Sequence, residues 1–518
     1  SFLLNRSGKK GELSLKLNKL DSIVDLSNWD SLRRVNNLAH FRYFLNINLY
    51  DSTLNLLTKE LELTDSIDYK DIYFELIRLQ TICQTQLGKH DDAIKSNFFS
   101  IKPEDFHGLT PKLLVKIASK VKAGEPIFYD KSNESIQFVS PVSGEVIEVI
   151  RGDKRRILEV KIQADKTQTY FDHKKIELKS AKREAIKAKL LSSGCWLFII
   201  QRPYDVIANP ETTPKSIFIS AYATAPLAAD YNFVLTGKQA ELQAAVTALS
   251  KLTDGKVNIS VPKDSHSPFT NLEDVVTHKI SGPHPSGNVG TLINKIDPIN
   301  KGEVVWTLTP QDLVIIGEVL LTGKFNAERI VALAGSGIQE PRYLVTKIGC
   351  EIATMVYDRG IQKDANVRII SGTVLNGKEI KPDGFLSYYS NVVTVIPEGD
   401  DYEFFGWNKP VFEKVSTSRA LTFSWMTPNK KFDLNTNTNG EHRAFVLTGT
   451  YEEVFPLDIF PLQILKACMY KDLDEMEALG MYEVAPEDFA LTEFICVSKQ
   501  PHQKIIREGL DLMLKEIG

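Results

Sequence analysis

The sequence predicts a multidomain protein of mixed α+β and α/β class, with a doubly wound α/β domain near its centre. The chain has 518 residues, a length that corresponds to about three to four domains of ordinary size. In the middle of the chain, short apolar runs alternate with helical patterns, which is typical of a mainly parallel sheet. On both sides of that region, β-prone runs alternate with Gly, Pro and Asn turns, which favours smaller antiparallel units.

The composition favours an ordinary globular protein. The net charge of −4 argues against a nucleic-acid binder, which would carry a concentrated basic face. No stretch approaches the roughly 18 consecutive apolar residues of a membrane-spanning helix, and the polar, lysine-rich start predicts no signal peptide. The five cysteines are far apart and form no C-x-x-C pair, so we predict no metal site and a reducing cytoplasmic location. Cys195 and Cys350 adjoin apolar runs, and we expect both to pack as small buried hydrophobes.

The first 97 residues are predicted to form a disordered arm followed by helices. Residues 1–27 are polar and weakly patterned, and we expect a disordered arm there. In residues 28–97, apolar side chains such as Leu38, Phe41 and Leu45 recur at helical spacing. Two degenerate tetratricopeptide-type repeats and a plain helical bundle explain this pattern equally well.

Residues 98–170 have the pattern of a small β-sandwich. A glycine turn at Gly124 precedes one strand, and a corner containing Ser140, Pro141 and Gly144 returns a later strand over its partner. This pattern resembles the barrel-sandwich unit of lipoyl and biotinyl domains. In such carriers an Asp-Lys pair presents the cofactor lysine, but here Ser140 follows Lys131 by nine residues, about two more than is usual. We therefore favour a solvated turn lysine over a modified Lys131.

Residues 171–364 are predicted to form a Rossmann-like α/β domain. A lysine-rich helix is expected at Asp172–Leu191, with its charges on a solvated face. Strands and helices then alternate. The predicted strands are Trp196–Ile200, Ser216–Ala221, Val257–Val261 and Arg329–Ala334, and the predicted helices are Gly237–Leu252 and Thr309–Leu321.

The last two regions return to short strands and then to helices. Residues 365–415 carry turn signals at Asn376-Gly377 and at Pro382-Asp383-Gly384, which favours a β-grasp, SLBB-like module ending near Trp407–Pro410. Residues 416–518 are predicted to form a helical C-terminal domain, with helices over Pro461–Gly518.

Several short motifs from Phe99 onward carry a resemblance to a known family. They are Ile101–Gly108, Pro226–Asp230, Gly282–Gly287, Gln311–Val314, Leu333–Gly335, Glu477–Gly480 and Glu487–Leu491. In this order they resemble the A subunit of the Na+-translocating NADH:quinone oxidoreductase (Na+-NQR). The helical first hundred residues depart from the short β segment with which that family opens.

The resemblance implies a component of a respiratory sodium pump, peripheral on the inner face of the bacterial cell membrane. Its partners would be the other Na+-NQR subunits, especially the membrane-embedded B subunit, with membrane contact only through them. The complex oxidises NADH, reduces ubiquinone or menaquinone and pumps Na+. FAD, FMN, riboflavin and the 2Fe-2S cluster would lie on other subunits, so we expect no cofactor on this chain and no catalysis by it alone. Two alternative functions are a lipoyl or biotinyl-type carrier and a scaffold that uses the N-terminal helices.

The strongest candidate site is the loop Gly282-Pro283-His284-Pro285-Ser286-Gly287. Its glycines permit close backbone approach to a ligand, its prolines fix the loop shape, and its histidine could hydrogen-bond a quinone carbonyl. The alternative is a structural loop, and no partner acid or nucleophile is predicted beside it, so we assign no catalytic residue.

Two weaker candidates follow strands. The glycine loop Gly335-Ser336-Gly337 is either a ligand loop for a phosphate or a tight turn between a strand and a helix. It lacks the third glycine of the dinucleotide fingerprint. Arg202 could steady an anionic group, but a structural ion pair is the favoured role.

Overall fold

The structure, a computed structural model, describes most of the chain after residue 95. It separates into two compact units, Ser1–Ala93 and Ile94–Gly518, of which the second contains every strand named below. The predicted arm at 1–27 lies outside the described residues, as do the predicted repeats at 28–97 except Leu56, Leu57, Ser96 and Asn97. The described residues are 56–57, 96–263, 267–357, 361, 366–400, 404–406, 415–416, 424–426, 430, 432–445 and 449–518.

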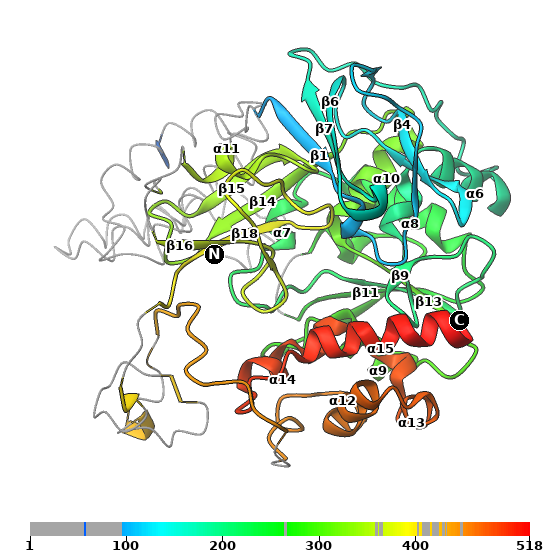
Figure 1. The fold of residues 1–518 in the computed structure, drawn as a ribbon. Coiled ribbons are helices and arrows are strands. Elements are labelled where there is room, and N and C mark those ends of the chain that lie inside the picture. Colours follow the sequence, from blue (N-terminus) through cyan, green and yellow to red (C-terminus); the bar gives the residue numbers. More distant parts are fainter. Residues whose placement is uncertain are drawn as a thin grey trace, which may run out of the picture. The chain divides into compact units, whose positions relative to one another are not determined.

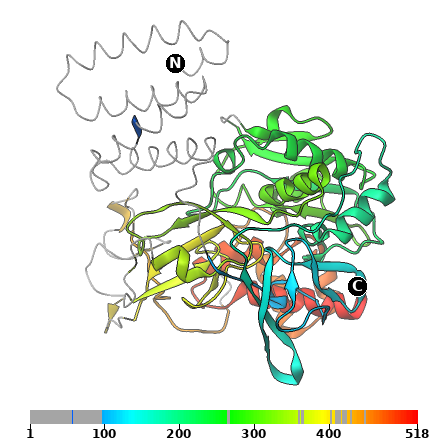
Figure 2. The same ribbon diagram turned by 90° about the horizontal axis from the view of Figure 1, so that it is seen from above.

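The second unit begins with the predicted β-sandwich (Figure 1). One sheet has the order β1 (Phe98–Ile101), β7 (Ile157–Ala164), β6 (Gly144–Arg151), β3 (Lys120–Val121). The other has the order β2 (Pro111–Leu113), β4 (Pro126–Asp130), β5 (Asn133–Val139). Phe128 and Phe138 stack with ring centroids 4.6 Å apart, and both are fully buried. The β6–β7 hairpin, cyan in Figure 2, projects beyond the other strands.

The next sheet is the predicted α/β domain, with strand order β12-β11-β10-β13-β8-β9. The first four strands run parallel to one another, whereas β8 and β9 are antiparallel additions at one edge. Its elements are α6 (Arg183–Ser192), η3 (Cys195–Phe198), β8 (Ile200–Arg202), β9 (Val206–Ile207), β10 (Ser216–Ser220), α7 (Tyr231–Val234), α8 (Gln239–Ser250), β11 (Val257–Pro262), η4 (Pro268–Asn271), β12 (Val276–Ile280), α9 (Val289–Ile296), β13 (Val305–Leu308) and α10 (Pro310–Thr322).

Two predictions for the start of this domain are wrong. The run Trp196–Ile200 is mostly the 3-10 helix η3, whose Trp196 Nε1 donates a hydrogen bond to the Ala208 carbonyl at 2.7 Å. A short buried apolar run has no periodicity that separates strand from helix. The predicted helix Asp172–Leu191 forms only from Arg183 onward. Before it, the His173 and Ile176 amides donate to carbonyls at the end of α10, so that segment uses another element's acceptors.

The third sheet has the order β15-β14-β18-β16-β17. The strand predicted at Arg329–Ala334 exists as β14, but it pairs with β18 and β15 in this sheet rather than with the α/β sheet. Strand character is a local property, whereas the partner strand is chosen by tertiary packing. The elements are β14 (Glu328–Ala334), β15 (Arg342–Lys347), α11 (Ile352–Val356), β16 (Val367–Ser371), β17 (Lys378–Glu379) and β18 (Val392–Pro397).

The turns predicted for this region are confirmed. Asn376 and Gly377 lie in the connection between β16 and β17, and the Gly384 amide closes a turn onto the Lys381 carbonyl at 2.9 Å. The predicted end of the module at Trp407–Pro410 lies outside the described residues.

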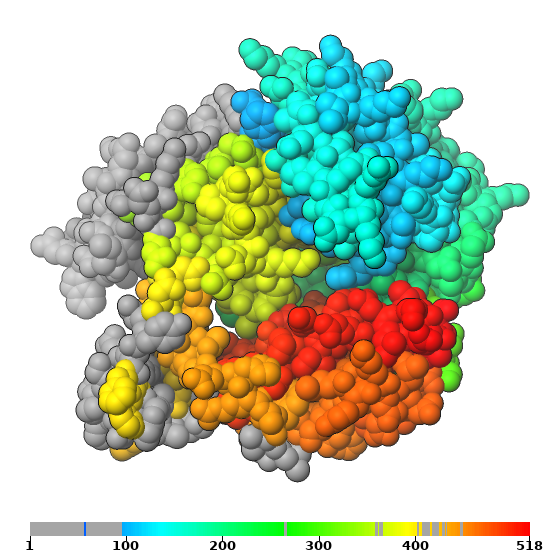
Figure 3. All heavy atoms as spheres, viewed as in Figure 1, coloured from blue at the N-terminus to red at the C-terminus, as the bar shows by residue number. Residues whose placement is uncertain are grey.

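Helices follow at the C-terminus, as predicted, and pack on the α/β domain (Figure 3). Their shared core joins Phe218, Leu292 and Val305 of the α/β domain to side chains of the longer C-terminal helices α12 and α15. In the described part of the chain, no helix is both long and apolar enough to cross a membrane. The C-terminal elements are α12 (Pro461–Tyr470), α13 (Leu473–Ala478), η8 (Met481–Glu483), η9 (Pro486–Phe489), α14 (Ala490–Ile495) and α15 (His502–Ile517).

Candidate functional site

The parallel sheet has a switch point beside β10, where the direction in which successive strands are added reverses. From β10 the chain adds β11 and β12 on one side and then places β13 on the other. Ligands of open α/β sheets bind at this kind of switch point, outside the carboxyl ends of the strands. The loop Gly282–Gly287 follows β12 and lies at this edge. Ser220 at the end of β10 donates to the Gly287 carbonyl at 2.5 Å, and Tyr222 donates to the Gly282 carbonyl at 3.0 Å.

Gly287 lies against the backbone of the segment that follows β10. A Cβ on Gly287 would lie 2.0 Å from the Tyr222 carbonyl oxygen, so no other residue fits there without backbone movement. The Gly287 amide also donates to Thr224 Oγ1 at 3.0 Å, and Ser286 closes the loop onto the Gly282 carbonyl. The close backbone approach at Gly287 is to the segment after β10, and the predicted approach of a ligand to this loop stays a prediction.

His284 is held in a defined orientation by the same threonine. Its Nδ1 lies 3.1 Å from Thr224 Oγ1. Because the Gly287 amide already donates to that oxygen, the network favours the hydroxyl as donor to Nδ1, which leaves the imidazole proton on Nε2. The Nε2 atom makes no hydrogen bond within the described residues. Partial burial lowers the pKa of His284, so the neutral ring dominates near pH 7 and offers one Nε2–H donor.

A buried ion pair lies at the start of α10. Arg329 of β14 donates through Nη2 to Asp312 Oδ1 at 2.5 Å, and both side chains are 1% exposed. Thr309 donates to the second carboxylate oxygen at 2.7 Å. The adjacent Gln311 side chain accepts from the Ile330 amide and donates to the Ile330 carbonyl. Gln311 and Asp312 thus join the α/β domain to the five-stranded sheet, a role that sequence reasoning missed although two polar residues open an otherwise apolar helix.

Arg202 forms the structural ion pair that we favoured. It donates to Asp488 at 3.0 Å and to Glu487 at 2.8 Å, both in η9. Gly290 of α9 makes room for the pair, since a Cβ there would lie 2.2 Å from Asp488 Oδ1. Arg202 is only 1% exposed, so it links the α/β domain to the C-terminal helices and is not accessible to a soluble anion.

The loop Gly335-Ser336-Gly337 joins β14 to β15 and does not precede a helix. Gly335 has φ 117°, and a Cβ on it would lie 2.0 Å from the Val395 carbonyl oxygen. The Gly337 amide donates to that same carbonyl at 3.0 Å. The loop therefore offers no helix N-terminus to a phosphate, and the turn that it makes connects two strands.

The four residues of the sandwich turn, Gly124, Ser140, Pro141 and Gly144, lie close together. The Gly124 amide donates to the Ser140 carbonyl, and the Ser140 amide donates to the Glu125 carbonyl. A Cβ on Gly144 would lie 2.0 Å from the Gln163 carbonyl oxygen. Pro141 is buried in the same corner, whereas Lys131 lies exposed at the turn between β4 and β5.

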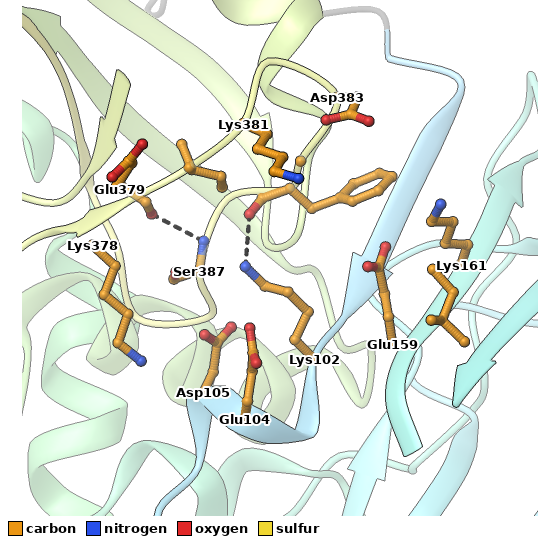
Figure 4. Close-up of a pocket in the computed structure, with 15 residues that line it drawn as sticks. Lys102, Glu104, Asp105, Glu159, Lys161, Lys378, Glu379, Lys381, Asp383 and Ser387 are labelled. Atoms are coloured by element: carbon orange, nitrogen blue, oxygen red, sulfur yellow. Dashed lines mark hydrogen bonds between the residues drawn. The ribbon is translucent and has the colours of Figure 1, made fainter. Parts of the chain in front are cut away.

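A cavity of about 320 Å³ lies between the sandwich and the loop that follows β17 (Figure 4). Lys102 donates to the Phe385 carbonyl at 2.9 Å, and Asp105 accepts from the Tyr388 amide at 2.9 Å. Burial raises the pKa of Asp105 and that of Glu159. The lining mixes both charges and joins the two domains. It comprises Lys102, Glu104, Asp105, Ile150, Glu159, Lys161, Ser371, Lys378, Glu379, Ile380, Lys381, Asp383, Gly384, Phe385 and Ser387.

The cysteines that the structure describes form no disulfide. Cys195 and Cys350 are both fully buried and unpaired, as predicted. Within the residues that the structure describes, no group of three or more His, Cys, Asp or Glu side chains could hold a metal ion.

Three family models match consecutive parts of this chain. The NqrA N-terminal barrel-sandwich hybrid domain matches residues 80–165, and the NqrA second alpha/beta domain matches residues 181–325. The NQRA C-terminal domain matches residues 330–381. The fold and these matches define a class of proteins in which a barrel-sandwich domain is followed by an α/β domain and a β-rich domain.

Curated relatives of the same family align with this chain over most of their own length. The A subunit of the Na(+)-translocating NADH-quinone reductase of Rhodopirellula baltica is 37% identical over 441 residues, covering 84% of this chain and 96% of the relative. The corresponding protein of Neisseria meningitidis serogroup A is 36% identical over 416 residues, covering 80% and 92%. The chain belongs to the NqrA family, the A subunits of the Na(+)-translocating NADH-quinone reductases. A solved NAD+-reducing NiFe-hydrogenase chain is similar at 12% identity over 45% of this chain and 52% of that chain, with a TM-score of 0.30, which supports no conclusion.

Proposed function

We propose that this chain is a peripheral, cytoplasmic-side component of a Na+-translocating NADH-quinone reductase that docks on the membrane subunits, above all the B subunit. The observation that carries the proposal is the identity of 37% over 96% of a relative from the NqrA family. The complex would oxidise NADH, reduce ubiquinone or menaquinone and move Na+ across the membrane. Hydride and electron transfer would take place on FAD, FMN, riboflavin and a 2Fe-2S cluster held by other subunits. This chain would hold no cofactor and would be inactive alone.

Within this function, the Gly282–Gly287 loop is proposed to contribute to the quinone site. His284 offers a neutral Nε2–H donor, and Thr224 fixes the direction of the ring. A quinone carbonyl accepts such a hydrogen bond, and the bond strengthens as reduction places negative charge on the oxygen. The His284 ring is half-buried and therefore partly shielded from water. A hydrogen bond from Nε2 to a quinone is stronger in such surroundings than in bulk water.

Copurification tests the assembly. A tagged chain expressed in cells that contain the partner subunits is expected to copurify with a membrane flavoprotein. Recovery of the chain solely as a monomer from such cells would contradict the proposed function.

Quinone photo-crosslinking on the assembled complex tests the loop. Label is expected on residues 282–287, and His284→Ala is expected to raise the KM for quinone about 2- to 10-fold, the value of one neutral hydrogen bond. The matched control is His278→Ala, which removes a half-buried histidine of β12 that bonds Asn258. Label elsewhere, with an unchanged KM, would remove the loop from the quinone site but leave the assembly into the reductase intact.

The exposed position of Lys131 at a hairpin turn is the one observation that favours the carrier alternative. Intact-mass measurement of the chain from its native cells decides between the two functions, because an unmodified Lys131 eliminates a lipoyl or biotinyl carrier. A scaffold role for the N-terminal region is tested by deleting residues 1–97 and measuring whether the complex still assembles.

A further inference from the structure

The β6–β7 hairpin ends in a strongly basic tip, Arg151–Arg156. The tip carries four cations, Arg151, Lys154, Arg155 and Arg156, against one carboxylate, Asp153, which gives it a net charge of +3. All five charged side chains are exposed. The chain as a whole carries a net charge of −4, so the tip opposes the sign of the rest of the molecule.

The tip stands at the end of a two-stranded ribbon. Strand β1 pairs with β7 only from Val160 onward, and β3 pairs with β6 only at Gly144 and Glu145. The end of the hairpin, from Ile150 to Glu159, therefore consists of two strands that, among the described residues, pair only with each other. This part of the hairpin extends beyond the sheet, and Figure 2 shows it projecting from the unit.

The tip is an ordered turn whose cations remain available. The Gly152 amide donates to the Arg156 carbonyl at 2.9 Å, and the Arg156 amide donates to the Asp153 carbonyl at 3.1 Å. Arg151 donates to the Arg155 carbonyl at 3.1 Å. The four cationic side chains form no ion pair with any described residue.

The chemistry of the tip decides which anionic partner it fits. A protein interface draws most of its affinity from a few anchors, among them Trp, Tyr and Arg, that are buried in an apolar and well-packed centre. Between Arg151 and Arg156 there is no apolar side chain. A layer of phospholipid headgroups needs no such anchor, because each exposed Lys or Arg near an anionic surface contributes independently through Coulomb attraction. Arginine also forms paired hydrogen bonds with phosphate oxygens.

We propose that the Arg151–Arg156 tip contacts anionic phospholipid headgroups directly. This contact adds to docking on partner subunits and differs from the expectation that the chain reaches the membrane only through them. It rests on the proposed function, since a chain that works at a membrane is needed for the contact to occur. A net charge of +3 strengthens partitioning onto an anionic surface by about 100-fold over a neutral one, enough to orient a docked protein but not to anchor it alone.

Vesicle cosedimentation of the purified full chain tests the proposal. We expect binding to phosphatidylcholine vesicles that contain phosphatidylglycerol, little binding to phosphatidylcholine alone, and loss of binding at high salt. The variant Lys154→Gln/Arg155→Gln/Arg156→Gln is expected to lower binding about 100-fold, to the level of neutral vesicles. The matched control Lys175→Gln/Lys179→Gln/Lys182→Gln removes the same charge from another exposed segment and is expected to bind nearly as the parent does.

Equal binding of the parent and the tip variant to anionic vesicles would overturn the proposal. If that variant also loses copurification with the membrane subunits, the tip is a protein contact. Failure of the parent chain to copurify, with the vesicle results as expected, would reject the proposed function, while the affinity of the tip for anionic lipid would still be established. An unchanged thermal unfolding midpoint shows that the variant is folded.

Discussion

The α/β domain contacts two of its neighbours, the five-stranded sheet and the C-terminal helices, through buried arginines whose charges are compensated differently. Arg329 faces one carboxylate, Asp312, and its Nε and Nη1 atoms have no hydrogen-bond partner in the described structure. Arg202 faces two carboxylates, Asp488 and Glu487, at the edge of a large apolar core shared with the C-terminal helices. The contact with the five-stranded sheet therefore buries a guanidinium against a single compensating charge, beside aromatic contacts such as Phe233 with Tyr343. The contact with the C-terminal helices depends mainly on apolar burial, with the charges as a supplement.

The largest effect is expected from removing Asp312. The variant Asp312→Ala leaves the Arg329 guanidinium buried without a counter-charge, which costs about 3–5 kcal/mol of the free energy of unfolding. Urea denaturation measures this loss. The double variant Asp312→Ala/Arg329→Met removes both charges and is expected to recover much of it. A single variant no less stable than the double would show that the pair does not hold this interface.

The second largest effect is a pH dependence of stability that comes from His502 in the C-terminal helices. His502, at the start of α15, is fully buried, and burial lowers its pKa to about 4. In the unfolded chain the His502 imidazole takes up a proton below about pH 6.5, whereas in the folded chain it stays neutral until the pH is much lower. Stability is complete above that pH and falls by about 3 kcal/mol as the pH drops toward 4. Hydrogen exchange of α15 across this range is the measurement, and His502→Gln is expected to remove most of the slope.

The smallest effect concerns the space around the second arginine. The variant Gly290→Ala places a Cβ 2.2 Å from Asp488 Oδ1 and 2.6 Å from Arg202 Nη1, so the pair must move. We expect a loss of about 1–3 kcal/mol, measured by thermal unfolding. In an Asp488→Ala background the clash with the carboxylate disappears, so the added cost of Gly290→Ala is expected to shrink. An equal cost in both backgrounds would place the strain elsewhere.

Local structure was largely readable from the sequence. The helix predicted at Thr309–Leu321 agrees with α10 within one residue at each end, because a proline opens it and a glycine follows it. The strands at Ser216–Ala221 and Val257–Val261 were equally clear, since they are short apolar runs bounded by turns. The Gly282–Gly287 loop was found for the same reason, since Gly and Pro leave a local signal.

Contacts between distant segments were not readable. The Arg202 carboxylates lie 285 and 286 residues away along the chain, and no spacing rule connects them. The run Trp196–Ile200 and the sheet of β14 were misassigned for a related reason, because apolar character does not specify which surface will cover it.

By itself, the sequence determined most of the kinds of elements, their approximate bounds and the family resemblance, and it contains the basic run Arg151–Arg156. Only the tertiary structure decided that Thr224 orients His284, that Asp312 compensates Arg329, and that the basic run ends a ribbon which no third strand covers in the described part of the chain. The physical reason is that periodicity and turn chemistry act over a few residues, whereas charge compensation and burial act between segments that folding alone brings together.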